Sequence, residues 1–123
     1  MVISPFDKYK ETQAQTANSA KLLLMLYDGA IRFVKLGIEG MEQEDYEKTN
    51  NNLVKAQAII NELIASLNFD YQIANDLLKI YDYMLYQLIQ ANVKKNTHFA
   101  KEVYDYLVEM KEAWTEASKR VSI

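Results

Sequence analysis

His98 is the one histidine among the 123 residues, and histidine is the side chain best suited to acid–base catalysis near neutral pH. The sequence shows no partner that would orient its ring. The pattern therefore favours a surface histidine near the beginning of a helix over a general base. A di-iron site in a helical bundle needs a Glu-x-x-His pair on each of two helices, which one histidine cannot supply.

Other kinds of site also lack the residues that they require. The chain has no cysteine, which excludes disulfides, thiolate metal sites and thiol catalysis. Its three glycines all lie between positions 29 and 40, so no glycine-rich phosphate-binding loop exists. The acidic stretch MEQED lacks the glycine and the alternating ligands of a calcium-binding loop, and we interpret it as a solvated turn. We therefore expect a protein that is not an enzyme and that uses no metal or other cofactor.

The charge and hydropathy of the chain limit its partners. The net charge is −3, and the basic stripe typical of nucleic-acid-binding proteins is absent. No run approaches the roughly 18 apolar residues that are needed to span a bilayer. The first residues, MVISPFDKYK, have neither the basic region nor the apolar stretch of a secretory signal. These features predict a cytoplasmic protein that neither binds nucleic acid nor inserts into a membrane.

The composition, with half the residues hydrophobic and a single proline, is typical of a helical domain. Apolar residues recur every three or four positions over 19–40, 46–67 and 71–92, and over a fourth segment capped by Asn96 or Thr97. The connections contain only a few residues, so successive helices should be antiparallel neighbours. The sequence predicts an all-α fold, an up-down antiparallel four-helix bundle over 19–118, with a loosely ordered N-terminal segment (1–18) and a C-terminal tail (119–123).

The first predicted helix has a wide apolar surface. Its charged residues gather within roughly 60° of its circumference, which leaves roughly 260° apolar or occupied by glycine. We place its core face at Leu23, Leu26, Ala30, Phe33, Val34 and Gly37, one flank at Leu24, Tyr27, Ile31 and Ile38, and the other flank at Leu22, Met25 and Leu36. A central position between two neighbouring helices would explain part of this width. The remainder indicates a partner site, because contiguous exposed apolar patches usually mark one.

Two features of composition bear on how the helices and partners meet. Gly29 and Gly37 lie two turns apart and are expected to let another helix approach closely. Nine tyrosines are present, several of them beside an acid, as in Tyr27-Asp28. Their rings can enter the core while their hydroxyl groups stay at its edge. Alternatively, some of them form a recognition surface, because tyrosine is enriched at interfaces.

Four segments resemble, in order and spacing, the FliS family of flagellar export chaperones: KLLLMLYDGAIRF, NNNLVKAQAIINELIASLN, IANDLLKIYDYMLYQLIQAN and EVYDYLVEMKEAW. The resemblance covers residues 19–114. It implies a four-helix bundle that binds the disordered C-terminal segment of flagellin in the cytoplasm. Such a chaperone prevents premature polymerisation and assists delivery of flagellin to the flagellar type III export gate. The resemblance also implies an N-terminal segment that lies over part of the client surface, with Phe6 and Tyr9 at its two anchoring positions.

Together, the wide apolar arc and the resemblance predict a hydrophobic client-binding surface and a lid. The predicted client-binding residues are Leu24, Met25, Tyr27, Asp28, Ile31, Ile38, Leu78, Tyr81 and Leu85, and the predicted lid residues are Phe6 and Tyr9. The alternative is a self-associating bundle, a scaffold homodimer without a client. In that case the surplus apolar surface would form an interface between two copies of the chain.

Overall fold

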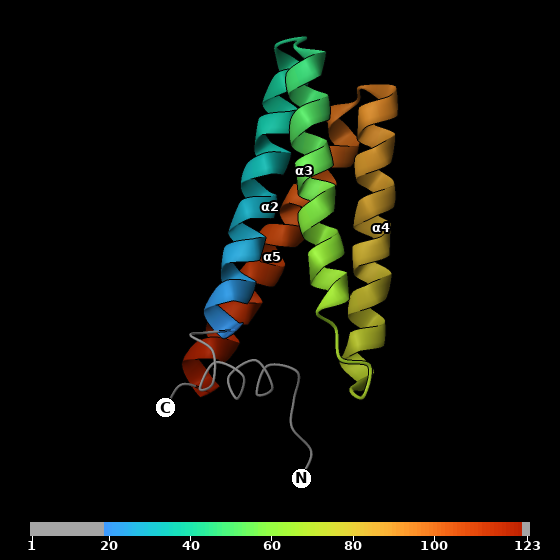
Figure 1. Cartoon of the computed structure of the whole chain (residues 1–123). Helices are drawn as coiled ribbons and strands as arrows, with labels where there is room; N and C mark the ends of the chain where they lie inside the picture. The colour runs from blue at the N-terminus through green and yellow to red at the C-terminus, as the bar shows by residue number, and fades with distance from the viewer. Residues whose placement is uncertain (1–18, 122–123) are drawn as a thin grey trace.

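The computed structural model of the protein describes residues 19–121, and these residues form four helices joined by short turns (Figure 1). They are α2 (Ser19–Glu42), α3 (Tyr46–Ala65), α4 (Gln72–Lys94) and α5 (Thr97–Val121). Successive helices run in opposite directions and pack against each other. The predicted all-α up-down bundle is therefore confirmed. The predicted lid residues Phe6 and Tyr9 lie outside the described residues.

Local capping interactions set two of the helix beginnings. The Asp45 carboxylate accepts a hydrogen bond from the backbone N–H of Lys48 at 3.1 Å, which satisfies one free donor in the first turn of α3. The Asn96 side chain likewise accepts a hydrogen bond from the backbone N–H of His98 at 2.9 Å. Of the two predicted caps of α5, Asn96 and Thr97, Asn96 is therefore the one that the structure shows. Lys95, immediately before it, adopts a left-handed conformation with φ 51° and ends α4.

The end of α2 differs from the predicted end of the first apolar segment at residue 40. The helix continues to Glu42, and the left-handed residue is Glu44, with φ 55°. Gly40 is needed for a different reason, because a Cβ atom there would lie 2.7 Å from the Thr49 hydroxyl and 2.8 Å from the Thr49 backbone nitrogen. At the other end of the chain, α5 continues to Val121, so residues 119–121 extend that helix instead of forming a tail.

The helices form a ring in which each packs against its neighbours in sequence and α5 closes the ring against α2. The α2–α3 interface is the most extensive, and the two helices approach closely at Gly37, where a Cβ atom would lie 2.5 Å from Cδ2 of Leu53. This confirms the predicted role of Gly37 in close helix approach. The centre of the ring holds apolar side chains from all four helices, including Val34, Leu53, Ile60, Leu63, Met84, Leu88, Val103 and Leu107.

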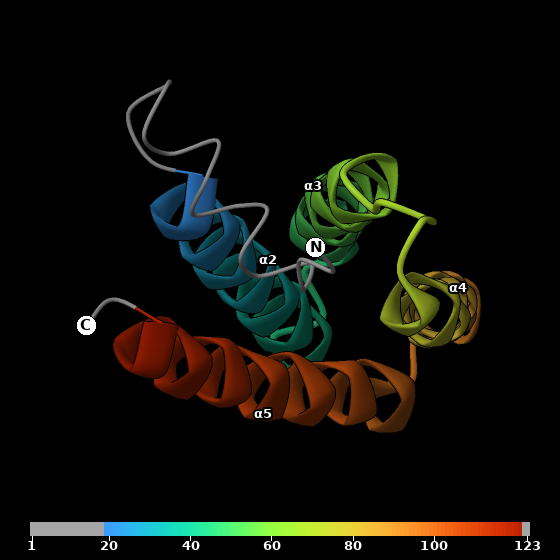
Figure 2. The same cartoon turned by 90° about the horizontal axis from the view of Figure 1, so that it is seen from below.

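The helices are not all parallel to one axis. Seen along the bundle in Figure 2, α3 and α4 appear nearly end-on, whereas α2 and α5 run obliquely across them. As a result, the N-terminal part of α4 and the C-terminal part of α5 diverge toward the lower end of Figure 1. This divergence matters for the site, because it leaves apolar side chains of both helices without a helix packed over them.

Candidate functional site

The structure shows which flank of α2 is covered. Helix α5 packs along the flank that carries Leu24, Tyr27, Ile31 and Ile38, so Tyr27 is fully buried and Ile38 is 8% exposed. Leu24 and Ile31 are half-buried. The prediction that Tyr27 lies outside the core is therefore wrong. Helical periodicity gave the angular width of the apolar arc correctly but could not indicate that α5 occupies this side.

Tyr27 also belongs to a buried polar cluster that joins three helices. Its hydroxyl oxygen lies 2.5 Å from the hydroxyl oxygen of Tyr81 on α4, and it accepts a hydrogen bond from Nε1 of Trp114 on α5 at 3.1 Å. Tyr81, another predicted client-binding residue, is 1% exposed. Tyr27 and Tyr81 therefore cannot contact a client directly in this conformation, and their hydroxyl groups are satisfied inside the protein.

The opposite flank of α2 is open at its N-terminal end. Leu22 and Met25 are 55% and 61% exposed, although both are large apolar side chains. Exposure of such side chains costs about 1.5–3 kcal/mol each relative to burial. Met25 is the most exposed of the apolar residues that were predicted to bind the client.

A second apolar surface lies where α4 and α5 diverge. A groove of about 370 Å³ is lined there by Ile73, Leu77, Ile80, Met110, Ala113, Trp114 and Ala117. Every one of these side chains is apolar or aromatic, and Ile73 and Ile80 are 43% and 39% exposed. A second hollow of the same size shares Ile80 and Met110 with it and continues along the two helices past Tyr83 and Tyr106. Together they form a continuous furrow, which we call the α4–α5 groove.

The α4–α5 groove was not part of the predicted client surface. Ile80 and Trp114 stand at regularly spaced apolar positions of two predicted helices, and an apolar stripe of this kind normally faces the core. Their spacing correctly put Ile73 with Ile80 on one face of α4, and Met110 with Trp114 on one face of α5. The groove and the exposure of Ile73 and Ile80 show that these faces remain partly uncovered, and Figure 2 shows that α5 runs obliquely to α4.

The remaining predicted residues of α4 lie away from the groove. Leu78 and Leu85 are half-buried, and Leu85 packs against the core. Beyond them, the outer surface of α4 carries three further exposed apolar side chains, at Tyr86, Ile89 and Val93. The apolar surplus that the sequence analysis attributed to the first helix is therefore shared with α4, which exposes more large apolar side chains than α2 does within residues 19–121.

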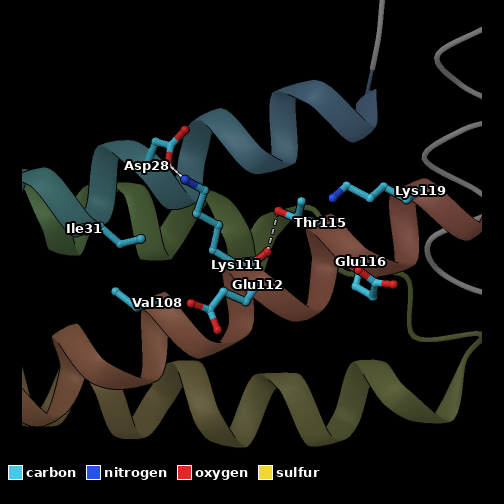
Figure 3. A pocket seen from close by; sticks show the side chains of 8 residues that line it. All are labelled: Asp28, Ile31, Val108, Lys111, Glu112, Thr115, Glu116 and Lys119. Atoms are coloured by element: carbon cyan, nitrogen blue, oxygen red, sulfur yellow. Dashed lines mark hydrogen bonds and ion pairs between the residues drawn. The ribbon is translucent and has the colours of Figure 1, made fainter.

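A hollow of different chemistry lies between α2 and α5 (Figure 3). It has a volume of about 540 Å³, with Ile31 and Val108 on its apolar side and Glu112, Glu116 and Lys119 at its charged side. Lys111 extends from α5 to Asp28 on α2, and its Nζ atom lies 2.5 Å from a carboxylate oxygen. Asp28, a predicted client-binding residue, is thus exposed and already paired. Because this ion pair is solvated, it contributes little to stability.

Tyr83 anchors a polar cluster on the rim of the α4–α5 groove. Its hydroxyl donates to the Glu102 carboxylate at 2.5 Å, and Nε2 of Gln87 donates to the same oxygen at 2.9 Å. The hydrogen bond to Glu102, with smaller effects of desolvation and nearby charge, raises the pKa of Tyr83 to about 12. The hydrogen bond from Tyr83, followed by that from Gln87, lowers the pKa of Glu102. This cluster links α4 to α5 at the edge of the groove.

Two features bear on the predicted lack of a metal site and on the position of the single histidine. His98 is exposed as the second residue of α5, which agrees with a surface histidine near a helix beginning. Between residues 19 and 121, no three His, Asp or Glu side chains gather closely enough to hold a metal ion. Within the same range, no helix is long and apolar enough to cross a membrane.

Comparisons with known proteins agree with this description. Residues 2–121 match a family described as "Flagellar protein FliS". The chain is 38% identical to the "Flagellar secretion chaperone FliS" of Bacillus subtilis, over 93% of this chain and 86% of that protein. It is 34% identical to the protein of the same name from Salmonella typhimurium, over 91% and 85% of the two chains. It is 28% identical to the protein of the same name from Campylobacter jejuni, over 96% of this chain and 94% of that protein.

Proposed function

This chain belongs to the FliS family of flagellar proteins, and we propose that it is a cytoplasmic export chaperone that binds the disordered C-terminal segment of flagellin. The observation that carries the proposal is the α4–α5 groove, in which seven apolar or aromatic side chains line a hollow of about 370 Å³. The relatives from Bacillus subtilis and Salmonella typhimurium are named flagellar secretion chaperones, which supports the same role here.

The groove has the form required to bind an amphipathic helix. Helix-in-groove recognition places apolar side chains at i, i+3, i+4 and i+7 of the bound segment into a furrow between two helices. The α4–α5 groove offers such a furrow, with Ile73 and Ile80 on one wall and Met110 and Trp114 on the other. A disordered segment can fold as it binds, and it then loses conformational entropy that burial of apolar surface must offset.

The proposed client surface includes accessible residues on both sides of the bundle. We retain Leu24, Met25, Asp28, Ile31, Leu78 and Leu85 as contact residues, and we add three groove residues, the exposed Ile73 and Ile80 and the half-buried Trp114. The buried residues Tyr27, Ile38 and Tyr81 support this surface from inside. A client that occupies several of these patches would wrap around the bundle as an extended chain with short helical parts.

Binding of this kind accounts for the two further parts of the proposed role. A flagellin segment held against the chaperone cannot pack into a filament, so premature polymerisation is prevented. An unfolded client is also the form that can pass through a narrow secretion channel, which fits delivery to the flagellar type III export gate. We further propose that Phe6 and Tyr9 form part of a lid that competes with the client for its apolar surface.

Calorimetric titration with a synthetic peptide of the flagellin C-terminal segment tests the proposal. We expect saturable binding at micromolar concentration and a gain of helical circular dichroism in the peptide. Ile80→Asp should weaken binding at least tenfold, because a charge in the apolar groove would be desolvated by the peptide. Val54→Asp is the matched control, since Val54 is an exposed apolar residue of α3 outside the groove. Absence of binding by the unmodified protein contradicts the proposal.

Self-association is the second candidate function, and the exposed outer face of α4 favours it. Tyr86, Ile89 and Val93 lie outside the α4–α5 groove and would form a patch suited to an interface between two copies. Sedimentation over a wide concentration range distinguishes the two functions. A tight dimer that the flagellin peptide leaves intact supports the scaffold, whereas a monomer, or a dimer that the peptide dissolves, supports the chaperone.

A further inference from the structure

Trp114 is the one side chain that belongs both to the α4–α5 groove and to the buried polar cluster. Its indole ring lines the groove, and its Nε1–H donates to the hydroxyl oxygen of Tyr27 at 3.1 Å. It is also the only tryptophan of the chain. The orientation of this large ring therefore affects the shape of the groove.

The acceptor of this hydrogen bond is held firmly in place. Tyr27 is fully buried, and its hydroxyl oxygen lies 2.5 Å from that of Tyr81. The two tyrosines belong to α2 and α4, which lie diagonally across the ring of helices, and Trp114 belongs to α5. A hydroxyl group set by the packing of the core thus determines where the indole ring of a groove residue lies.

An aromatic ring at the edge of a groove can adopt several rotamers if nothing selects among them. A hydrogen bond to a buried acceptor selects one, and it also penalises rotamers that leave the indole N–H buried without a partner. A binding surface organised in advance loses less entropy when its ligand binds.

We propose that Tyr27 is a positioning residue for client binding: its hydroxyl holds the Trp114 indole in the orientation that shapes the α4–α5 groove. This inference rests on the proposed function, because it assigns Tyr27 a role in binding that same client. Tyr27 acts through Trp114 and does not itself touch the client. The burial that excludes Tyr27 from direct contact is what allows it to set the position of Trp114.

Two conservative substitutions separate positioning from stability. Tyr27→Phe and Tyr81→Phe each keep the aromatic ring and remove one hydroxyl from the same buried cluster, so both should lower the thermal midpoint. Only Tyr27→Phe removes the acceptor of the Trp114 hydrogen bond. We expect it to weaken binding of the flagellin peptide about tenfold, the factor that corresponds to one hydrogen bond, and Tyr81→Phe to weaken it less than about twofold.

Fluorescence of Trp114 in the free protein gives an independent readout, since no other tryptophan contributes. Tyr27→Phe should increase quenching of Trp114 by acrylamide and shift its emission, whereas Tyr81→Phe should leave both close to those of the unmodified protein. If the two variants change quenching equally, the positioning role is overturned. If the unmodified protein binds no peptide, the proposed function fails, and the quenching comparison still decides whether Tyr27 positions Trp114.

A double-mutant cycle completes the test. Trp114→Phe removes the same hydrogen bond from the donor side, and it serves as the second variant if Tyr27→Phe does not fold. In the Trp114→Phe background, Tyr27→Phe should cause no further loss of peptide affinity, because the interaction through which it acts is already absent. An additional tenfold loss in that background would show that Tyr27 acts independently of Trp114 and would overturn the inference.

Discussion

The hydroxyl oxygens of Tyr27 and Tyr81 lie 2.5 Å apart in the core, although 54 residues separate the two tyrosines in the sequence. The contact joins α2 to α4, which otherwise lie on opposite corners of the ring. It shows that the flank of α2 beside the core face is itself part of the interior. The most exposed large apolar residues of α2 are instead Leu22 and Met25 on the other flank.

This difference predicts opposite effects for two substitutions on the same helix. Tyr27→Asp should destabilise the protein by more than about 4 kcal/mol, because it buries an unpaired charge. Met25→Asp should change stability by less than about 1 kcal/mol, since Met25 is 61% exposed, and it should weaken peptide binding about tenfold. Thermal unfolding beside a binding isotherm measures both effects. A stable Tyr27→Asp variant would contradict the burial of this residue.

Two glycines of α2 provide a matched pair for helix packing. A Cβ atom at Gly37 would lie 2.5 Å from Cδ2 and 2.9 Å from Cγ of the buried Leu53, whereas one at Gly29 would meet only the terminal Cδ1 atom of Ile59, at 3.0 Å. Gly37→Ala should destabilise the protein by about 1–2 kcal/mol, because the free-energy cost of overpacking against Leu53 exceeds the stabilisation that alanine gives to a helix relative to glycine. Gly29→Ala should be neutral or stabilising by up to about 1 kcal/mol. Chemical denaturation compares them, and equal effects would contradict the close approach at Gly37.

The pair formed by Tyr83 and Glu102 predicts a pH dependence at alkaline pH. The hydrogen bond to Glu102 raises the pKa of Tyr83 from 10.0 to about 12, so the folded protein holds the phenol proton more tightly than the unfolded chain does. The stability that this group contributes is therefore complete below pH 10 and is lost as the pH rises toward 12. Glu102→Gln should return the pKa of Tyr83 toward 10.0. Titration followed by NMR of labelled tyrosine rings measures it in the unmodified protein and in the Glu102→Gln variant.

The same pair predicts the opposite sign at acid pH. Hydrogen bonds from Tyr83 and Gln87 lower the pKa of Glu102, so its contribution is present above the ordinary carboxyl pKa of 4.5 and is lost as the pH falls through the lowered value. Gln87→Leu removes the second of these donors and should raise the pKa of Glu102 while that of Tyr83 changes less. An unchanged carboxyl titration in this variant would show that Gln87 does not contribute.

The proposed lid gives a kinetic prediction. If the N-terminal segment competes with the client, only a fraction of the free protein has its binding surface uncovered. The apparent affinity for the client is then reduced in proportion to that fraction. Replacing both Phe6 and Tyr9 by Ala should then speed association of the flagellin peptide and increase binding of a hydrophobic dye. Faster dissociation without faster association would instead indicate that the segment clasps the bound client. Stopped-flow measurements separate the two, and unchanged rates would remove any role of the segment in recognition.

Much of the fold could be predicted from the sequence because the relevant interactions are local. Helix positions follow from apolar spacing over a few turns, and Asn96 could be proposed as a cap because the amide that it binds belongs to His98, two residues away. The glycine at position 37 could be linked to close packing because of its residue type alone, since only a residue without Cβ permits the contact with Leu53 of α3. Gly40 shows where prediction from residue type fails, because glycine is suited both to a helix end and to a close contact between helices.

The candidate site depended on contacts between residues that are far apart in the sequence. Periodicity places Tyr27 and Met25 on two sides of one helix, but it contains no information about which side α5 covers. The spacing of Ile73 with Ile80 likewise assigns them to one face of α4 without indicating that α5 crosses obliquely and leaves that face partly open. The sequence by itself determined four amphipathic helices and their family, through local spacing and motif order. The tertiary structure decided which apolar faces meet and which remain exposed, because the crossing angles of packed helices depend on all their side chains together.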